Sequence, residues 1–304
     1  MGNQNDSSQV LEMVQRWILT LEQMDLEIVD DSTVYSIVRE LMALFGARPI
    51  GINTSNHVYR IRRNLDERLH STLNFDWYPP LFSTVSQLWY PPSEGVNSRG
   101  RVNLVHESVF YCAESLNTAV LEMRPKPGQY LTLLECSFVE GATPKVFDAG
   151  VYEGPGQLNP NYGGGRPEKD TQFQAFLCDQ GIKEATELIR TFLVTQFMKV
   201  VDQGNEYEYK ITNTIAKVLL NEFAFVRKDD FTPVEVVADG IAYASIAAEA
   251  KAPNVAFTCK AADRLLKPFA CCVYFVESLS ETGWPILQKS HVAQNLNADG
   301  TITW

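Results

Sequence analysis

The sequence of 304 residues contains no apolar run of about 18 residues, the length that a helix needs to cross a bilayer. Residues 1–8 also lack the basic-then-apolar order of a signal peptide. Hydrophobic residues make up 45% of the chain, which is ordinary for a soluble globular protein. We therefore expect a cytoplasmic protein with no membrane partner.

Cysteine and histidine are few, and neither shows the spacing of a metal site. The six cysteines include no Cys-x-x-Cys pair, and most lie in apolar runs such as residues 269–275. This arrangement is typical of reduced, buried thiols. The four histidines are scattered along the chain, so we expect surface or hydrogen-bonded structural histidines and no metal.

Basic residues are outnumbered, and the formal net charge is −11. Duplex binding usually needs a basic face, so this charge argues against direct nucleic-acid binding. A small anionic ligand is still compatible with it. A few arginines that converge in a cleft can bind a pyrophosphate, because local charge and hydrogen-bond geometry outweigh distant screened charges.

The first 50 residues have the pattern of a helical hairpin. Apolar residues recur at helical spacing over residues 8–26, and a second stripe over residues 31–45 follows the capping sequence Asp31-Ser32-Thr33 and ends at Gly46. We expect an N-terminal helical extension, residues 1–50, that packs on the core. A dedicated partner-binding arm is the alternative.

From residue 57 onward, short apolar runs alternate with Pro, Gly and Asn, the pattern of strands and loops. Helices are expected at residues 182–200 and 209–220, a core strand at 269–276 and a last short strand at 301–304. Residues 141–170, rich in Gly and Pro, predict a long loop that is either a lid or a plain insertion. The repeated Trp-Tyr-Pro-Pro at 77–80 and 89–92 predicts either proline-braced aromatic packing or an aromatic wall beside a ligand ring. The class is α+β.

One segment predicts a strand followed by a helix that carries a carboxylate. Val109-Phe110-Tyr111-Cys112 is a short apolar run, and Ser115 then caps a helix over residues 116–123 that Pro125 stops. Glu122 falls in the last helical turn, on the shoulder of the apolar face. A carboxylate there can lean over the end of the strand.

Several short sequence motifs, called boxes below, follow one another along the chain at defined spacings. Tyr111 lies ten residues after Arg101, and Glu122 eleven residues after Tyr111. The set comprises His57-Val58-Tyr59-Arg60-Ile61, Pro91-Pro92, Gly100-Arg101-Val102-Asn103, residues 109–122 and Asp239-Gly240-Ile241-Ala242-Tyr243-Ala244-Ser245. Together the boxes resemble the RES family over residues 57 to about 276. The chain differs from that family in having Val102 where an aromatic is usual and in its greater length.

The resemblance implies an ADP-ribosyltransferase-like mixed sheet with flanking helices, and residues 51–304 as an NAD-binding catalytic domain with the 141–170 insertion. NAD⁺ would be the substrate, with no cofactor. The implied reaction cleaves the nicotinamide–ribose bond, and Glu122 would stabilise the ribosyl oxocarbenium ion. Arg101, and secondarily Arg60, would hold the pyrophosphate. Tyr111 would face the nicotinamide, and Ser245 would orient it or the ribose, with Tyr243 beside it in the binding set.

The resemblance leaves the acceptor open. Water would make the protein a glycohydrolase, phosphate a phosphorylase, and a protein side chain a mono-ADP-ribosyltransferase. A non-catalytic binding protein on the same fold is the other hypothesis. The family commonly acts as the toxin of a toxin–antitoxin pair, so a helix-turn-helix antitoxin and a homo-oligomer are the implied protein partners. Taken singly, each site residue also fits a structural role, such as a solvated Glu or a surface-paired Arg.

Overall fold

The computed structural model describes residues 3–45, 49–64, 81–149, 153–154, 157–158, 180–221, 224–226, 233–235, 238–247 and 253–304. The chain forms two compact units. Unit 1 comprises Met1–Asn53, Glu94–Glu107 and Pro144–Ala244, and unit 2 comprises Thr54–Ser93, Ser108–Thr143 and Ser245–Trp304. Helices occur together with parallel and antiparallel strand pairs, which confirms the predicted α+β class. The expected boundary at residue 50 stays a prediction.

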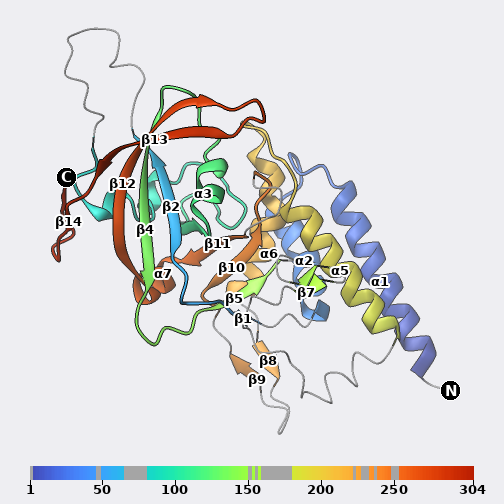
Figure 1. The fold of residues 1–304 in the computed structure, drawn as a ribbon. Helices are drawn as coiled ribbons and strands as arrows, with labels where there is room; N and C mark the ends of the chain where they lie inside the picture. The colour runs from blue at the N-terminus through green and yellow to red at the C-terminus, as the bar shows by residue number, and fades with distance from the viewer. Residues whose placement is uncertain are drawn as a thin grey trace. The chain divides into compact units, whose positions relative to one another are not determined.

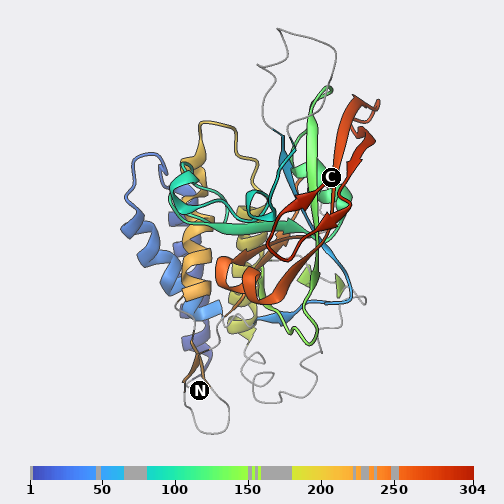
Figure 2. The same cartoon turned by 90° about the vertical axis from the view of Figure 1, so that its left-hand side faces the viewer.

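Four helices dominate unit 1. They are α1 (Asn3–Gln23), α2 (Asp31–Phe45), α5 (Gln180–Phe197) and α6 (Lys210–Asn221). Helix α1 lies along α5 and α2 lies along α6 (Figures 1 and 2). The apolar stripes of the N-terminal hairpin are buried, with Val14 and Val38 both at 0% exposure. The hairpin was therefore predicted correctly as two helices, and it packs within unit 1.

The cap of α2 differs by one residue from the prediction. Asp30, not Asp31, accepts the hydrogen bonds of the first turn, from Thr33 N at 2.9 Å and Thr33 Oγ1 at 2.8 Å. A capping side chain reaches the amide three residues on, and Thr33 lies at that distance from Asp30. Bonds from Ser32 and Thr33 also lower the pKa of Asp30 well below its usual range.

Unit 1 has a small group of strands. β5 (Lys145–Asp148) pairs antiparallel with β1 (Ile50–Gly51) and parallel with β10 (Gly240–Ala244). The loop predicted over residues 141–170 is wrong at β5, because Val146 and Phe147 are buried and lie in a strand. The described residues of unit 1 also form two short strand pairs: β6 (Glu153–Gly154) with β7 (Gln157–Leu158), and β8 (Ala224–Val226) with β9 (Pro233–Glu235). Most of the remaining insertion lies outside the described residues.

Unit 2 is built on antiparallel strands in the order β11-β3-β2-β4-β12-β13. Their bounds are β2 Val58–Arg63, β3 Val109–Ala113, β4 Tyr130–Phe138, β11 Pro253–Thr258, β12 Leu266–Leu279 and β13 Pro285–Val292. The described residues of unit 2 include the helices α3 (Leu116–Glu122) and α7 (Cys259–Leu265). The strand predicted at 269–276 is part of β12, and the last strand is β15 (Ile302–Thr303), paired with β14 (Asn295–Leu296). Within the described residues, short 3₁₀ helices cover Val85–Gln87, Ser93–Gly95 and Glu206–Tyr209, the last of them in unit 1.

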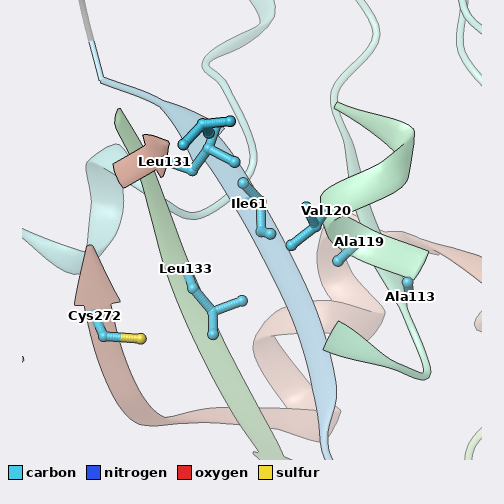
Figure 3. Close-up of a cluster of buried hydrophobic side chains, with 8 residues drawn as sticks. Ile61, Ala113, Ala119, Val120, Leu131, Leu133 and Cys272 are labelled. Carbon is cyan, nitrogen blue, oxygen red and sulfur yellow. The ribbon is translucent and has the colours of Figure 1, made fainter. Parts of the chain in front are cut away.

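Helix α3 packs on one face of the unit 2 strands. Ser115 caps it as predicted, with its Oγ accepting from Thr118 N at 3.1 Å. Ala119 and Val120 point toward Ile61 of β2 (Figure 3), and the cluster continues through Leu133. The apolar stripe therefore fixes the rotation of α3, and with it the position of Glu122 at the end of the helix.

Candidate functional site

The carboxylate of Glu122 is held by two donors from distant parts of the chain. Its Oε1 accepts from Ser245 Oγ at 2.6 Å and from Asn254 Nδ2 at 2.7 Å. Ser245 is 0% exposed and Asn254 4% exposed, whereas Glu122 is exposed. The described residues make no hydrogen bond to Oε2, which leaves that oxygen available to a ligand. Unit 2 thus brings together two predicted site residues, Glu122 and Ser245.

Strand pairing explains how Asn254 reaches this carboxylate. Asn254 of β11 lies opposite Ala113 at the end of β3, and Glu114 N donates to Pro253 O at 3.1 Å. Paired residues project from the same face of a sheet, and Ala113 belongs to the face that α3 covers. Asn254 therefore lies beneath α3. The sequence interpretation missed it, although an amide directly before the apolar run 255–257 was a weak signal for a buried polar contact.

Tyr111 projects from the same face of the sheet as Asn254. It precedes Ala113 by two residues on β3 and pairs with Ala256, which lies two residues after Asn254. Side chains alternate along a strand, so Tyr111 shares the face that carries α3 and Glu122. Its ring is partly buried. This arrangement agrees with a role for Tyr111 near Glu122.

Arg60 lies on the face of the sheet opposite to α3. Main-chain oxygens accept the hydrogen bonds of its guanidinium. Its Nε donates to Leu88 O at 2.9 Å and to Trp89 O at 3.0 Å, and its Nη1 donates to Tyr111 O at 2.8 Å. The Cζ atom lies 5.3 Å from the centre of the Phe110 ring. Burial lowers the pKa of Arg60 to about 10, so the group still carries its charge at neutral pH. Through these bonds Arg60 joins residues 88–89 to β3, away from Glu122.

The second Trp-Tyr-Pro-Pro segment is braced by α7. Trp89 Nε1 donates to Asp263 Oδ1 at 2.9 Å, and Tyr90 Oη donates to Asp263 Oδ2 at 2.8 Å. Trp89 also packs on Phe110, with 4.6 Å between the ring centres. The bond to Asp263 raises the pKa of Tyr90 to about 12. This copy is packed on the fold, while the copy at 77–80 lies outside the described residues.

Arg101 and Tyr243 belong to unit 1. Arg101 Nη2 donates to Lys199 O at 2.8 Å, and its Cζ lies 5.2 Å from the centre of the Tyr209 ring. Tyr243 of β10 is 6% exposed, and its ring centre is 5.8 Å from that of Phe197. Tyr243 thus contributes to the core of unit 1. Arg101 keeps its Nη1 buried without a hydrogen-bond partner among the described residues.

His57 and the buried cysteines make structural contacts. His57 Nδ1 is 2.5 Å from Glu135 Oε1, as expected of a hydrogen-bonded histidine. Cysteines 112, 136, 271 and 272 are buried and unpaired, and burial raises their pKa, so their thiols are protonated at neutral pH. The described part of the chain has no cluster of three or more metal-ligating side chains. None of its helices is long and apolar enough to cross a membrane.

No protein-family model matches this chain. No curated protein matches its sequence either. The resemblance to the RES family therefore rests on the boxes given above and on their spacing.

Proposed function

We propose that this protein cleaves the nicotinamide–ribose bond of NAD⁺. The observation that carries the proposal is the carboxylate of Glu122, held at the end of α3 by Ser245 and Asn254. A carboxylate beside a ribose stabilises the positive charge that develops on the sugar as the glycosidic bond breaks. The resemblance to the RES family supplies the identity of the substrate.

The proposed chemistry needs no strong general acid. Nicotinamide leaves as a neutral ring from a cationic one, so the main task is to stabilise the ribosyl oxocarbenium ion. Two donors fix Oε1 of Glu122, and Oε2 is then available to accept from a ribose hydroxyl. This interaction strengthens as the sugar becomes cationic, so it lowers the barrier more than it improves substrate binding. Ser245 and Asn254 act as positioning residues through Glu122.

The same site serves each acceptor. Transfer of ADP-ribose to water defines a glycohydrolase, transfer to phosphate a phosphorylase, and transfer to a side chain a mono-ADP-ribosyltransferase. The proposal places the protein in the cytoplasm as an NAD⁺-depleting toxin, with a helix-turn-helix protein as its antitoxin. If the protein is instead a non-catalytic binding protein on the same fold, it would bind NAD⁺ without releasing nicotinamide.

Incubation of the purified protein with NAD⁺ tests the proposal. Chromatography and mass spectrometry should detect free nicotinamide together with ADP-ribose, a phosphorylated ADP-ribose when phosphate is added, or a protein adduct. Glu140→Gln provides a matched control for Glu122→Gln, because Glu140 is an exposed carboxylate of the same unit. The proposal fails if nicotinamide does not exceed the level without enzyme, or if both variants retain full activity.

A further inference from the structure

Unit 1 contains a cavity of about 660 Å³ where the carboxyl ends of α1 and α5 meet α6. Most of its walls are apolar, and the apolar lining side chains are Leu21, Met24, Leu26, Val194, Met198 and Ile211. Cavities of about 300–1,000 Å³ with mainly apolar walls are typical of small-molecule sites. The two methionines add flexible thioether groups that can adapt to the shape of a ligand. All of these residues belong to unit 1, whereas Glu122 and Ser245 belong to unit 2.

Gln196 supplies a buried amide to this cavity. It lines the cavity and is only 8% exposed. Its side-chain amide can donate two hydrogen bonds and accept two, yet it makes none to the described residues. Buried polar groups in native proteins are nearly always hydrogen-bonded. The partner of this amide therefore has to lie in the cavity, as water or as a polar group of a ligand.

The helix ends at the cavity favour a positive charge. Leu21 and Glu22 lie in the last turn of α1, and Val194 and Gln196 lie in the last turn of α5. The carboxyl end of a helix carries a partial negative charge. Neither helix has a basic residue in its last turn to balance that charge.

The charged side chains of the cavity leave the negative potential in place. Lys199 lines the cavity, but its Nζ lies 2.9 Å from Glu208 Oε2, so this ammonium group is already paired. Glu22 also lines the cavity, is exposed, and makes no ion pair with a described residue. A ligand with an apolar body and a positive charge would therefore match both the walls and the charge of this cavity.

We propose that the cavity binds a small organic amine. The apolar body of the amine packs on the leucine and methionine side chains, and its protonated amino group is stabilised by Glu22 and by the two helix ends. The amide of Gln196 forms a hydrogen bond to a polar group of the ligand body. A neutral ligand with the same body gains the apolar contacts alone, and an anionic one is repelled.

Three probes that share one indole body test the preference for an amine. Tryptamine carries an amino group, tryptophol a hydroxyl and indole-3-propionate a carboxylate. Calorimetric titration of the full chain measures the dissociation constants, and thermal melts measure the stabilisation by each probe. We expect tryptamine to bind about fivefold or more tightly than tryptophol, because the helix ends and Glu22 each favour a cation. Indole-3-propionate should bind most weakly.

Three variants locate the binding. Glu22→Gln keeps the shape of the side chain and removes its charge, so the preference for tryptamine over tryptophol should fall about twofold or more. Gln196→Met keeps the length of the side chain and removes the amide, so tryptamine should bind about threefold or more weakly. Glu12→Gln removes the same charge as Glu22→Gln from an exposed residue of α1 that does not line the cavity, and it should leave binding unchanged.

The melting temperature without ligand separates binding from structure at Gln196. Gln196→Met should match or exceed the wild-type value, because it removes a buried amide that has no partner in the described protein. A clearly lower value, with tryptamine affinity unchanged, would make Gln196 a structural residue and refute its role in the site.

The proposal is overturned if tryptamine does not bind, or if either of the other probes binds as tightly. Wild-type affinity for tryptamine in both Glu22→Gln and Gln196→Met would also overturn it. If no probe binds and sedimentation shows dimers, the cavity belongs instead to an interface with a second copy of the chain. These outcomes do not depend on the proposed reaction, because the probes contain no nicotinamide–ribose bond.

Discussion

Substitution of Glu122 by Gln tests the proposed reaction most directly. The amide oxygen of Gln can still accept from Ser245 and Asn254, so the geometry is kept while the charge is removed. Hydrogen bonds to charged groups contribute about 1.5–3 kcal/mol and neutral ones about 0.5–1.5, so the two bonds together lose about 2 kcal/mol. Across 304 residues this lowers the melting temperature by about 3 °C.

The effect of this substitution on catalysis should be far larger than its effect on stability. Removal of one preorganised electrostatic interaction typically lowers kcat about a hundredfold or more, whereas NAD⁺ binding should change little. Nicotinamide release under saturating NAD⁺ measures kcat, and thermal melts measure stability. Activity within about twofold of wild type would contradict the reasoning. A collapsed melting temperature would assign Glu122 a structural role instead.

Three further predictions concern other residues. Arg101→Lys keeps the charge but loses the planar fork, so NAD⁺ affinity should fall in titrations while thermal stability changes little; equal affinity would remove Arg101 from the site. Asn254→Asp places a second carboxylate against Glu122, so one of the pair should have a raised pKa. The melting temperature of Asn254→Asp should therefore be close to that of the wild type near pH 4 and fall further below the wild-type value as the pH rises toward 8. A difference in melting temperature that stays constant with pH would contradict the contact between residues 122 and 254. Tyr90 has a pKa raised to about 12 by Asp263, so it stabilises the fold below pH 10 and loses this contribution as the pH rises from 10 to 12. Unfolding of Tyr90→Phe, monitored by absorbance, should not show this loss of stability between pH 10 and 12. An identical loss in the variant would refute the prediction.

The helices and several strands could be predicted from the sequence because their signals are local. The apolar stripes gave the hairpin, and the helix over 116–122 follows from Ser115, whose side chain caps an amide three residues away. The apolar run at 109–112 likewise became β3. The predicted loop over 141–170 was wrong at β5, since Val146 and Phe147 form a strand only through pairing with distant partners.

The sequence by itself determined that Glu122 ends a helix, because periodicity and capping act within a few residues. Only the tertiary structure decided which groups meet that carboxylate. Ser245 and Asn254 lie 123 and 132 positions further along the chain, and Asn254 reaches Glu122 because β11 pairs with β3 beneath α3. Pairing of β2 with β3, which sets Tyr59 opposite Ala113, puts Arg60 on the other face of the sheet, where main-chain oxygens of residues 88, 89 and 111 accept from its guanidinium. Long-range strand pairing depends on hydrogen bonds and burial across the whole sheet, so local pattern does not specify these contacts.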